Sequence, residues 1–263
     1  MQIIKEYVAE KKEKLKQLDL SNLKLVIIQV GAVEASCRYV RNKLKDCESV
    51  NLPAELIKLP EETTEAQILD LIKSLNEDET VTGFIVQLPL PKHISEQKVI
   101  EAIDPKKDVD GFSKLAKVNP GTPQGILDYL VDNNVEFQDK NAVVIGRSNI
   151  VGRPMAKLLL EKNCNVTILH SRTSEENKRL YLKNADIIVS AVGKRNIITS
   201  DYELKPTAII IDVGINTNEY GKLVGDIEQD LPVAFKSPVP GGCGLTTRLA
   251  LITNLIKLGE LSK

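Results

Sequence analysis

Short apolar runs alternate along the first part of the chain with longer segments in which apolar residues recur at helical spacing. The apolar runs predict three strands: Leu25–Val30, Ala54–Leu59 and Val81–Leu88. The helical spacing predicts helices over residues 3–20, 64–75 and 95–103, and a further helix capped by Ser36. Strands that alternate with helix-sized segments are typical of an α/β fold with a parallel sheet.

The same alternation continues after residues 118–121, whose Val-Asn-Pro-Gly sequence is typical of a linker. Thr122 and Pro123 then predict a helix start, with threonine as the N-cap and proline in the first helical position. Four more strands are predicted: Ala142–Ile145, Asn165–Leu169, Asp186–Val189 and Ala208–Val213. We therefore expect two domains, over residues 1–119 and 120–245, the second with the β-α-β plan of a nucleotide-binding domain.

Residues 142–160 predict a phosphate site. An apolar, β-branched strand runs into Gly146, and helical spacing begins again shortly after it. Residues 147–150 are therefore expected at a helix N-terminus, where unpaired N–H groups and the helix dipole attract an anion such as a nucleotide pyrophosphate. The usual G-x-G-x-x-G is only partly present, with Ser148 in place of its second glycine. A strand-turn-helix unit that binds nothing is the alternative.

The end of the predicted strand Asn165–Leu169 indicates which nucleotide is bound. An NAD site usually has an acidic residue here that holds the ribose 2′-hydroxyl, whereas this chain continues His170-Ser171-Arg172-Thr173. The hydroxyl of Ser171 and the guanidinium of Arg172 suit a 2′-phosphate, and Arg147 supplies a second cation. The pattern favours NADP, and a solvated loop arginine is the alternative for Arg172.

Tyr39 and Lys43 lie one turn apart in the second predicted helix, at the edge of its apolar stripe. Desolvation there, together with the charges of Arg38, Arg41 and Lys45, would lower the pKa of Lys43 toward a range useful for proton transfer. Taken alone, however, this segment favours an ordinary solvated basic helix face with a lysine that snorkels to water.

Two further polar positions fall in the first domain. Gln87 lies near the carboxyl end of the third predicted strand, where open α/β sheets bind ligands, and its amide needs either a backbone group or a substrate as partner. Asp108 and Asp110 lie in a Gly-bounded loop, where a carboxylate more often caps a turn than binds a ligand.

Composition limits the class of protein. The chain has 263 residues, of which 42% are apolar and 27% charged, and this fits a soluble globular protein with two cores. A net charge of -1 gives no long-range attraction to nucleic acid or to an anionic membrane, and we expect neither as a partner. The amphipathic N-terminus lacks the apolar core of a signal peptide and no apolar run is long enough to span a bilayer, so we expect a cytoplasmic protein.

Cysteine and histidine usage points away from metal and disulfide chemistry. Four cysteines are scattered without a C-x-x-C pair: Cys37, Cys47, Cys164 and Cys243. This spacing argues against a structural zinc site and against a disulfide framework. Since His93 and His170 are the only histidines, a histidine-based triad or metal site has little choice of partners.

Several motifs follow one another along almost the whole chain. They are YVRNK at 39–43, VQLPLP at 86–91, KDVDGF at 107–112, GRS at 146–148 with VGRP at 151–154, DVGIN at 212–216 and PVPGG at 238–242. In this order they closely resemble the bifunctional methylenetetrahydrofolate dehydrogenase/cyclohydrolase family.

The resemblance implies a two-domain α/β fold in which the C-terminal helix, within residues 246–263, completes the first, folate-binding domain, and a Rossmann-like domain binds NADP. It implies oxidation of 5,10-methylenetetrahydrofolate to the methenyl form, followed by hydrolysis to 10-formyltetrahydrofolate, with no metal. It also implies a homodimer in one-carbon metabolism, where tetrahydrofolate interconversion serves purine, methionine and histidine biosynthesis.

The resemblance further implies roles for individual residues. Lys43 is the implied general acid/base, Tyr39 positions it, and Gln87 orients the lysine and the folate nitrogen. The implied folate contacts are Asp110, which anchors the pterin ring, and Tyr39, Pro240 and Gly241. The implied cofactor contacts are Gly146, Arg147, Ser148, Ser171 and Ile215.

The chain departs from the family pattern around the folate. Ser113-Lys114 replaces His-Pro, C-G-L-T-T at 243–247 replaces V-G-P-M-T, and A-V-E-A-S at 32–36 replaces D-D-P-A-S. A monofunctional dehydrogenase and a folate- or nucleotide-sensing protein without turnover are therefore alternatives. The presence of both Lys43 and Gln87 argues against the sensing protein.

Overall fold

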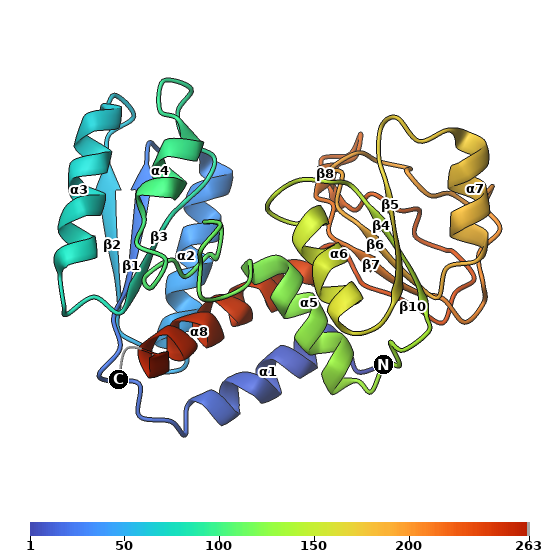
Figure 1. The fold of residues 1–263 in the computed structure, drawn as a ribbon, viewed down its shortest axis with the longest axis horizontal. Helices are drawn as coiled ribbons and strands as arrows, with labels where there is room; N and C mark the ends of the chain where they lie inside the picture. Colours follow the sequence, from blue (N-terminus) through green and yellow to red (C-terminus); the bar gives the residue numbers. More distant parts are fainter. Residues whose placement is uncertain (262–263) are drawn as a thin grey trace. The chain divides into compact units, whose positions relative to one another are not determined.

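The computed structural model describes residues 1–261, which form two compact units. Unit 1 consists of Met1–Val8 and Thr122–Thr247, and unit 2 consists of Ala9–Gly121 and the residues from Arg248 onward. Two helices, α1 (Ile4–Leu15) and α8 (Cys243–Leu261), contribute residues to both units (Figure 1). Neither unit is therefore one continuous segment of the chain.

Unit 2 is built on three parallel strands in the order β2-β1-β3. The strands are β1 (Leu25–Val30), β2 (Ala54–Leu59) and β3 (Gly83–Val86). The helices between and after them are α2 (Glu34–Glu48), α3 (Glu65–Glu77) and α4 (Glu96–Ala102). The predicted bounds of β1 and β2 are confirmed, whereas β3 begins two residues after the predicted Val81 and ends two residues before the predicted Leu88. The pairing ends ahead of Pro89, which has no N–H to donate.

All six residues of β1 are buried, as expected of a central parallel strand. Its residues alternate between two apolar cores. Leu25 and Ile27 pack in a core that includes residues of α2 and α8, whereas Val26 and Ile28 pack in a core that includes residues of α3 and α4. The sheet of unit 2 is thus covered by helices on both faces (Figure 1).

Unit 1 contains a second parallel sheet, in the order β10-β7-β6-β4-β5. Its strands are β4 (Asn141–Ile145), β5 (Asn165–Leu169), β6 (Ile187–Ser190), β7 (Ile209–Asp212) and β10 (Phe235–Lys236). The helices α5 (Gly121–Asp132), α6 (Gly152–Glu161) and α7 (Glu175–Lys183) accompany them, together with an antiparallel hairpin of β8 (Asn216–Thr217) and β9 (Leu223–Val224). The chain continues from β4 to β5 on one side and then to β6 on the other, so the loop after β4 lies where the strand order reverses.

The predicted α/β architecture is confirmed, but two predicted helix caps are wrong. The helix α2 begins after Val33, which makes no side-chain cap, so Ser36 lies inside the helix. Glu34 in the first turn complements the helix dipole instead. The helix α5 begins at Gly121, so Thr122 and Pro123 lie within its first turn. No helix lies over residues 191–208, between β6 and β7.

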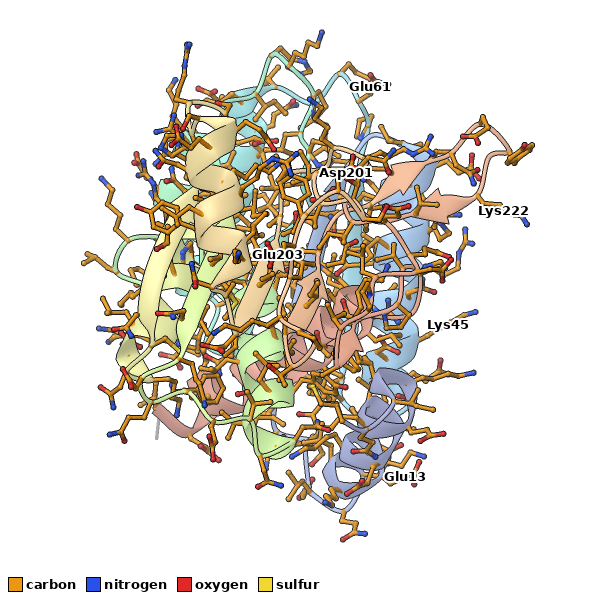
Figure 2. The ribbon with its side chains drawn as sticks, turned by 90° about the vertical axis from the view of Figure 1, so that its right-hand side faces the viewer. Glu13, Lys45, Glu61, Asp201, Glu203 and Lys222 are labelled. Atoms are coloured by element: carbon orange, nitrogen blue, oxygen red, sulfur yellow. The ribbon has the colours of Figure 1, made fainter. Side chains whose placement is uncertain are left out.

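Charged side chains, among them Glu13, Lys45 and Lys222, point away from the ribbon (Figure 2). All four cysteines are free thiols, and three of them are buried. None of the helices within residues 1–261 is both long and apolar enough to span a membrane.

Candidate active site

Lys43 is the buried cation of unit 2. It lies on α2 and is only 5% exposed, so the solvated helix face that the local sequence favours is wrong. Burial lowers the pKa of the Lys43 amine, because water no longer stabilises its charged form, and the negative charge of Asp110 opposes this effect. The amine therefore loses its proton more readily than that of an exposed lysine.

Gln87 holds the Lys43 amine. The lysine Nζ donates a hydrogen bond to Gln87 Oε1 at 3.1 Å, and Gln87 Nε2 donates to the backbone oxygen of Leu88 at 2.7 Å. The backbone N–H of Gln87 donates to Ile28 O of the neighbouring strand β1 at 2.8 Å. Gln87 thus lies at the carboxyl end of the sheet with its side-chain oxygen directed at the lysine.

Asp108 and Asp110 share one loop but differ in their contacts. The buried Asp108 carboxylate accepts hydrogen bonds from the backbone N–H groups of Gly111 at 2.9 Å and Ser113 at 2.8 Å, so it caps the turn. Asp110 instead has its Oδ1 3.9 Å from Lys43 Nζ. Burial raises the pKa of Asp110, the charge of Lys43 opposes this rise, and the charge of Asp108 adds to it.

The ring of Tyr39 lies beside two cations. Its centroid is 5.2 Å from Lys43 Nζ and 6.0 Å from Cζ of Arg248 on α8. Arg248 also donates through Nε to the carboxylate of Asp46 on α2. Sequence reasoning does not reveal Arg248, which lies 202 positions from Asp46. The available signal is the acidic Asp46 one turn after Lys43, since a carboxylate beside an apolar stripe needs a partner when buried.

Asn254 of α8 is a second residue that sequence reasoning does not reveal. Its buried Nδ2 donates to the backbone oxygens of Val109 and Asn119, both at 3.0 Å. These bonds fix both sides of the loop that carries Asp110. The signal that could have found it is an asparagine among the apolar residues 249–252 and 255–256 of this helix.

In unit 1 the connection between β4 and α6 is tightly built. Gly146 has a φ of 113°, and a Cβ there would lie 2.6 Å from the backbone oxygen of Ala191. A Cβ on Gly152 would lie 2.3 Å from the backbone oxygen of Gly146. Because only glycine fits at both positions, the start of α6 approaches the end of β4 closely, as a dinucleotide-binding loop requires.

The helix after this loop begins later than predicted. Since α6 starts at Gly152, residues 147–150 precede the helix and do not form its first turn. The Ser148 hydroxyl accepts hydrogen bonds from the N–H groups of Val151 at 3.1 Å and Gly152 at 3.3 Å. Ser148 therefore shapes the entry to the helix, and the side chains of Arg147 and Ser148 are exposed beside it.

The loop after β5 lies next to the Gly146 loop. The strands β4 and β5 pair in parallel, and Gly146 N–H donates to Leu169 O at 2.9 Å. Ser171 and Arg172 are exposed in this second loop. Because the two loops follow neighbouring strand ends, Arg147 and Arg172 belong to one edge of the sheet.

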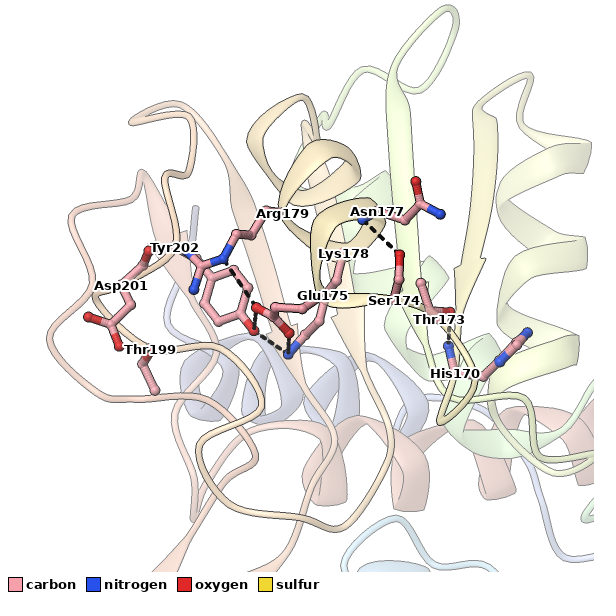
Figure 3. A network of polar contacts seen from close by, with 10 residues as sticks. All are labelled: His170, Thr173, Ser174, Glu175, Asn177, Lys178, Arg179, Thr199, Asp201 and Tyr202. Atoms are coloured by element: carbon pink, nitrogen blue, oxygen red, sulfur yellow. Dashed lines mark hydrogen bonds and ion pairs between the residues drawn. The ribbon is translucent and has the colours of Figure 1, made fainter.

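Hydrogen bonds hold the loop after β5 at the start of α7 (Figure 3). The backbone N–H of His170 donates to Thr173 Oγ1 at 3.0 Å, and the hydroxyl of Ser174 caps α7. In the first turn of α7, Glu175 accepts a hydrogen bond from the Tyr202 hydroxyl at 2.6 Å. The loop that carries Ser171 and Arg172 is therefore fixed at the start of α7. This helix in turn is bonded through Glu175 to Tyr202, in the segment that connects β6 to β7.

The other predicted residues of unit 1 also follow strand ends. Ile215, which is 67% exposed, comes after β7, and the exposed Pro240 and Gly241 come after β10. Because all five strands are parallel, these loops leave the same edge of the sheet as the Gly146 loop. In the part of the chain that the structure describes, no three His, Cys, Asp or Glu side chains are arranged to hold a metal ion.

Comparisons with known proteins match two domain models of one family to the chain. A family model described as "Tetrahydrofolate dehydrogenase/cyclohydrolase, catalytic domain" matches residues 1–110, and the model for the NAD(P)-binding domain of the same family matches residues 120–263. A Staphylococcus saprophyticus protein named bifunctional protein FolD is 46% identical, over 97% of this chain and 93% of that protein.

Solved structures show the same similarity. The bifunctional methylenetetrahydrofolate dehydrogenase/cyclohydrolase from Campylobacter jejuni has 38% identity and a TM-score of 0.89, over 99% of this chain and 95% of that one. The Trypanosoma brucei dehydrogenase-cyclohydrolase, solved with NADP cofactor and an inhibitor, has 29% identity and a TM-score of 0.87, over 98% of this chain and 94% of that one.

Proposed function

The chain belongs to the tetrahydrofolate dehydrogenase/cyclohydrolase family, and from this premise we propose that it has both activities. It oxidises 5,10-methylenetetrahydrofolate to the methenyl form with NADP and hydrolyses that product to 10-formyltetrahydrofolate. The observation that carries this proposal is the buried Lys43 amine, held by Gln87 and facing Asp110.

The contacts of these residues support the roles that we propose for them. A neutral Lys43 amine can take a proton from the water that adds to the methenyl carbon, and it tolerates the cationic methenyl product better than an ammonium would. Gln87 orients the amine, and Tyr39 limits its movement. Asp110 anchors the pterin, since one carboxylate can accept two parallel hydrogen bonds from the amino-pyrimidinone edge.

The proposed cofactor residues belong to unit 1. The close approach at Gly146 and Gly152 suits a pyrophosphate, and the exposed Arg147, Ser171 and Arg172 suit a 2′-phosphate. Ser148 and Ile215 complete the proposed cofactor contacts, and Pro240 and Gly241 are proposed to contact folate. When bound, NADP supplies the acceptor for the hydride that leaves the methylene carbon.

Replacing Lys43 by methionine tests the proposal, because hydride transfer needs mainly alignment whereas water addition needs a base. We expect Lys43→Met to lose methenyl hydrolysis by about a hundredfold or more while NADPH formation stays measurable. Lys45→Met, which removes an exposed lysine of the same helix, is the matched control. Near-normal hydrolysis by folded, NADP-competent Lys43→Met would overturn the role of this lysine.

Two alternatives give different results with the unmodified protein. A monofunctional dehydrogenase would form NADPH without accelerating methenyl hydrolysis. A sensing protein without turnover would reduce neither NADP nor NAD, although it would bind folate or nucleotide.

The remaining features are proposed mainly from the family. We infer a folate domain of residues 1–119 completed by residues 246–263, and an NADP domain of residues 120–245. The compact units support these limits, although residues 1–8 group with unit 1. We also infer a cytoplasmic homodimer that serves purine, methionine and histidine biosynthesis. The exposed Leu180 and Tyr181 of α7 are compatible with a subunit contact, which sedimentation of the purified protein tests.

A further inference from the structure

Two cations share the ring of Tyr39, and only one of them can change its charge. Lys43 Nζ and Arg248 Cζ lie 5.2 and 6.0 Å from the ring centroid. A tyrosine ring attracts a nearby cation, but two cations at one ring repel each other. An arginine stays charged throughout the working pH range of an enzyme, whereas a lysine can lose its proton. The repulsion from Arg248 therefore disfavours the protonated form of Lys43.

Asp46 holds Arg248 at this position. One carboxylate oxygen of Asp46 accepts from Arg248 Nε, and the other accepts from Lys12 Nζ. The three side chains come from three helices, α1, α2 and α8, and none is more than 18% exposed. A buried carboxylate bound through both oxygens leaves the guanidinium little freedom to move away.

The other titratable groups near Lys43 do not have the effect of Arg248, which is to lower the pKa of the lysine. Asp110 favours the charged form of the lysine, and burial raises the pKa of the Cys47 thiol to about 12, so this thiol stays neutral. Arg248 is the positive group that lowers the pKa of Lys43. The cations that the sequence suggested for this effect are exposed on α2: Arg38, Arg41 and Lys45.

We propose that Arg248, held by Asp46, is a positioning residue for hydrolysis that keeps the Lys43 amine unprotonated at the pH at which the enzyme works. This inference rests on the proposed function of Lys43 as the base. The amine can take a proton from water only in its neutral form. Burial favours that form most strongly and the Asp110 carboxylate disfavours it, and the charge of Arg248 adds to the effect of burial.

The pH dependence of hydrolysis tests the inference. Methenyl hydrolysis at saturating substrate, corrected for the reaction in buffer, is measured from roughly pH 6 to 10 for the unmodified protein and for Arg248→Gln, Arg248→Lys and Lys45→Met. Glutamine keeps a donor for Asp46 but removes the charge, so this variant retains the packing of the pair. Thermal unfolding and NADPH formation establish that each variant is folded.

We expect the midpoint of the Arg248→Gln profile to rise by about one pH unit, so that hydrolysis falls about tenfold at neutral pH and recovers at high pH. Arg248→Lys keeps a charge at the site and should keep the midpoint near that of the unmodified protein. Lys45→Met removes a cation that points away from the ribbon (Figure 2) and should leave the midpoint in place.

An Arg248→Gln profile that loses rate equally at every pH would show a structural role only and would overturn the inference. A shift of equal size in Lys45→Met would overturn it too, because the effect would then be one of net charge. Normal hydrolysis by Lys43→Met would instead refute the proposed function. Failure of that variant combined with an unshifted Arg248→Gln profile would refute the inference alone.

Discussion

Replacing Asn254 by alanine should loosen the loop that carries Asp110. The Asn254 side chain makes two hydrogen bonds, to Val109 O and Asn119 O, and it is 4% exposed. Each bond is worth about 1 kcal/mol, and a buried carbonyl left without a partner costs about 1 to 3 kcal/mol. We therefore expect the free energy of unfolding to fall by about 2 to 4 kcal/mol, which urea unfolding measures.

The same substitution should weaken folate binding. Asp110 directly follows Val109, so the loss of the Asn254 contact lets the carboxylate move away from the position in which it faces Lys43. If the bond between Asp110 and the pterin loses about half of its free energy, KM for methylenetetrahydrofolate should rise roughly tenfold. We expect KM for NADP to stay unchanged, because the proposed cofactor residues belong to unit 1 whereas Asn254 belongs to unit 2.

Asn76→Ala is the matched control for this experiment. Asn76 also makes two hydrogen bonds in unit 2, from Nδ2 to Ala102 O at 2.8 Å and from the N–H of Asp104 to its Oδ1 at 2.9 Å. It should lower the free energy of unfolding without the rise in KM for folate. If Asn254→Ala lost stability but had the same KM for folate as Asn76→Ala, the link between Asn254 and the proposed pterin anchor Asp110 would be refuted.

Two further substitutions test the nucleotide and pterin contacts. Arg172→Ala should raise the NADP constant roughly ten- to hundredfold, since one charged phosphate contact is lost, and leave NAD use unchanged in the NADPH and NADH formation assays; equal use of both nucleotides by the unmodified protein would contradict the assignment. Asp110→Ala should lower oxidation and hydrolysis together, because both steps use the same bound folate. An Asp110→Ala protein that oxidised normally and failed only in hydrolysis would give this carboxylate another role.

Strands were the most predictable part of the fold. The bounds of β1, β2 and β5 agree with the predicted runs. The strand β1 is buried along its whole length, whereas β2 and β5 lie at sheet edges, so their alternating polar residues can face solvent without ending the strand. Helix starts were less predictable, since they depend on which group satisfies the first N–H donors. At α6 the Ser148 hydroxyl does so from outside the helix, and apolar spacing does not reveal such a bond.

The sequence predicted which residues form the site better than it predicted their burial and the charges around them. The motifs name Lys43, Gln87 and Asp110, and the structure brings these three together. The burial of Lys43 could not be read from α2, because the groups that cover it come from other elements. The cation that lowers the pKa of Lys43 could not be predicted either. The cations near Lys43 in the sequence are exposed, and the cation that has this effect is Arg248 of α8.

The helix α8 has a consequence for how the chain is made. Its residues Leu251, Ile252 and Leu255 belong to the same core as Leu25 and Ile27 of β1. Domains commonly fold in the order of their synthesis, the first-made before the later ones. Here residues 9–121 leave the ribosome well before the residues of α8 that belong to the same unit. Part of one face of their sheet therefore stays uncovered until the chain has been made as far as residue 248 and beyond. Most of the unit that carries Lys43 is synthesised before unit 1, but its core is completed only after unit 1 has been made, and until then the apolar residues that α8 covers stay without this helix.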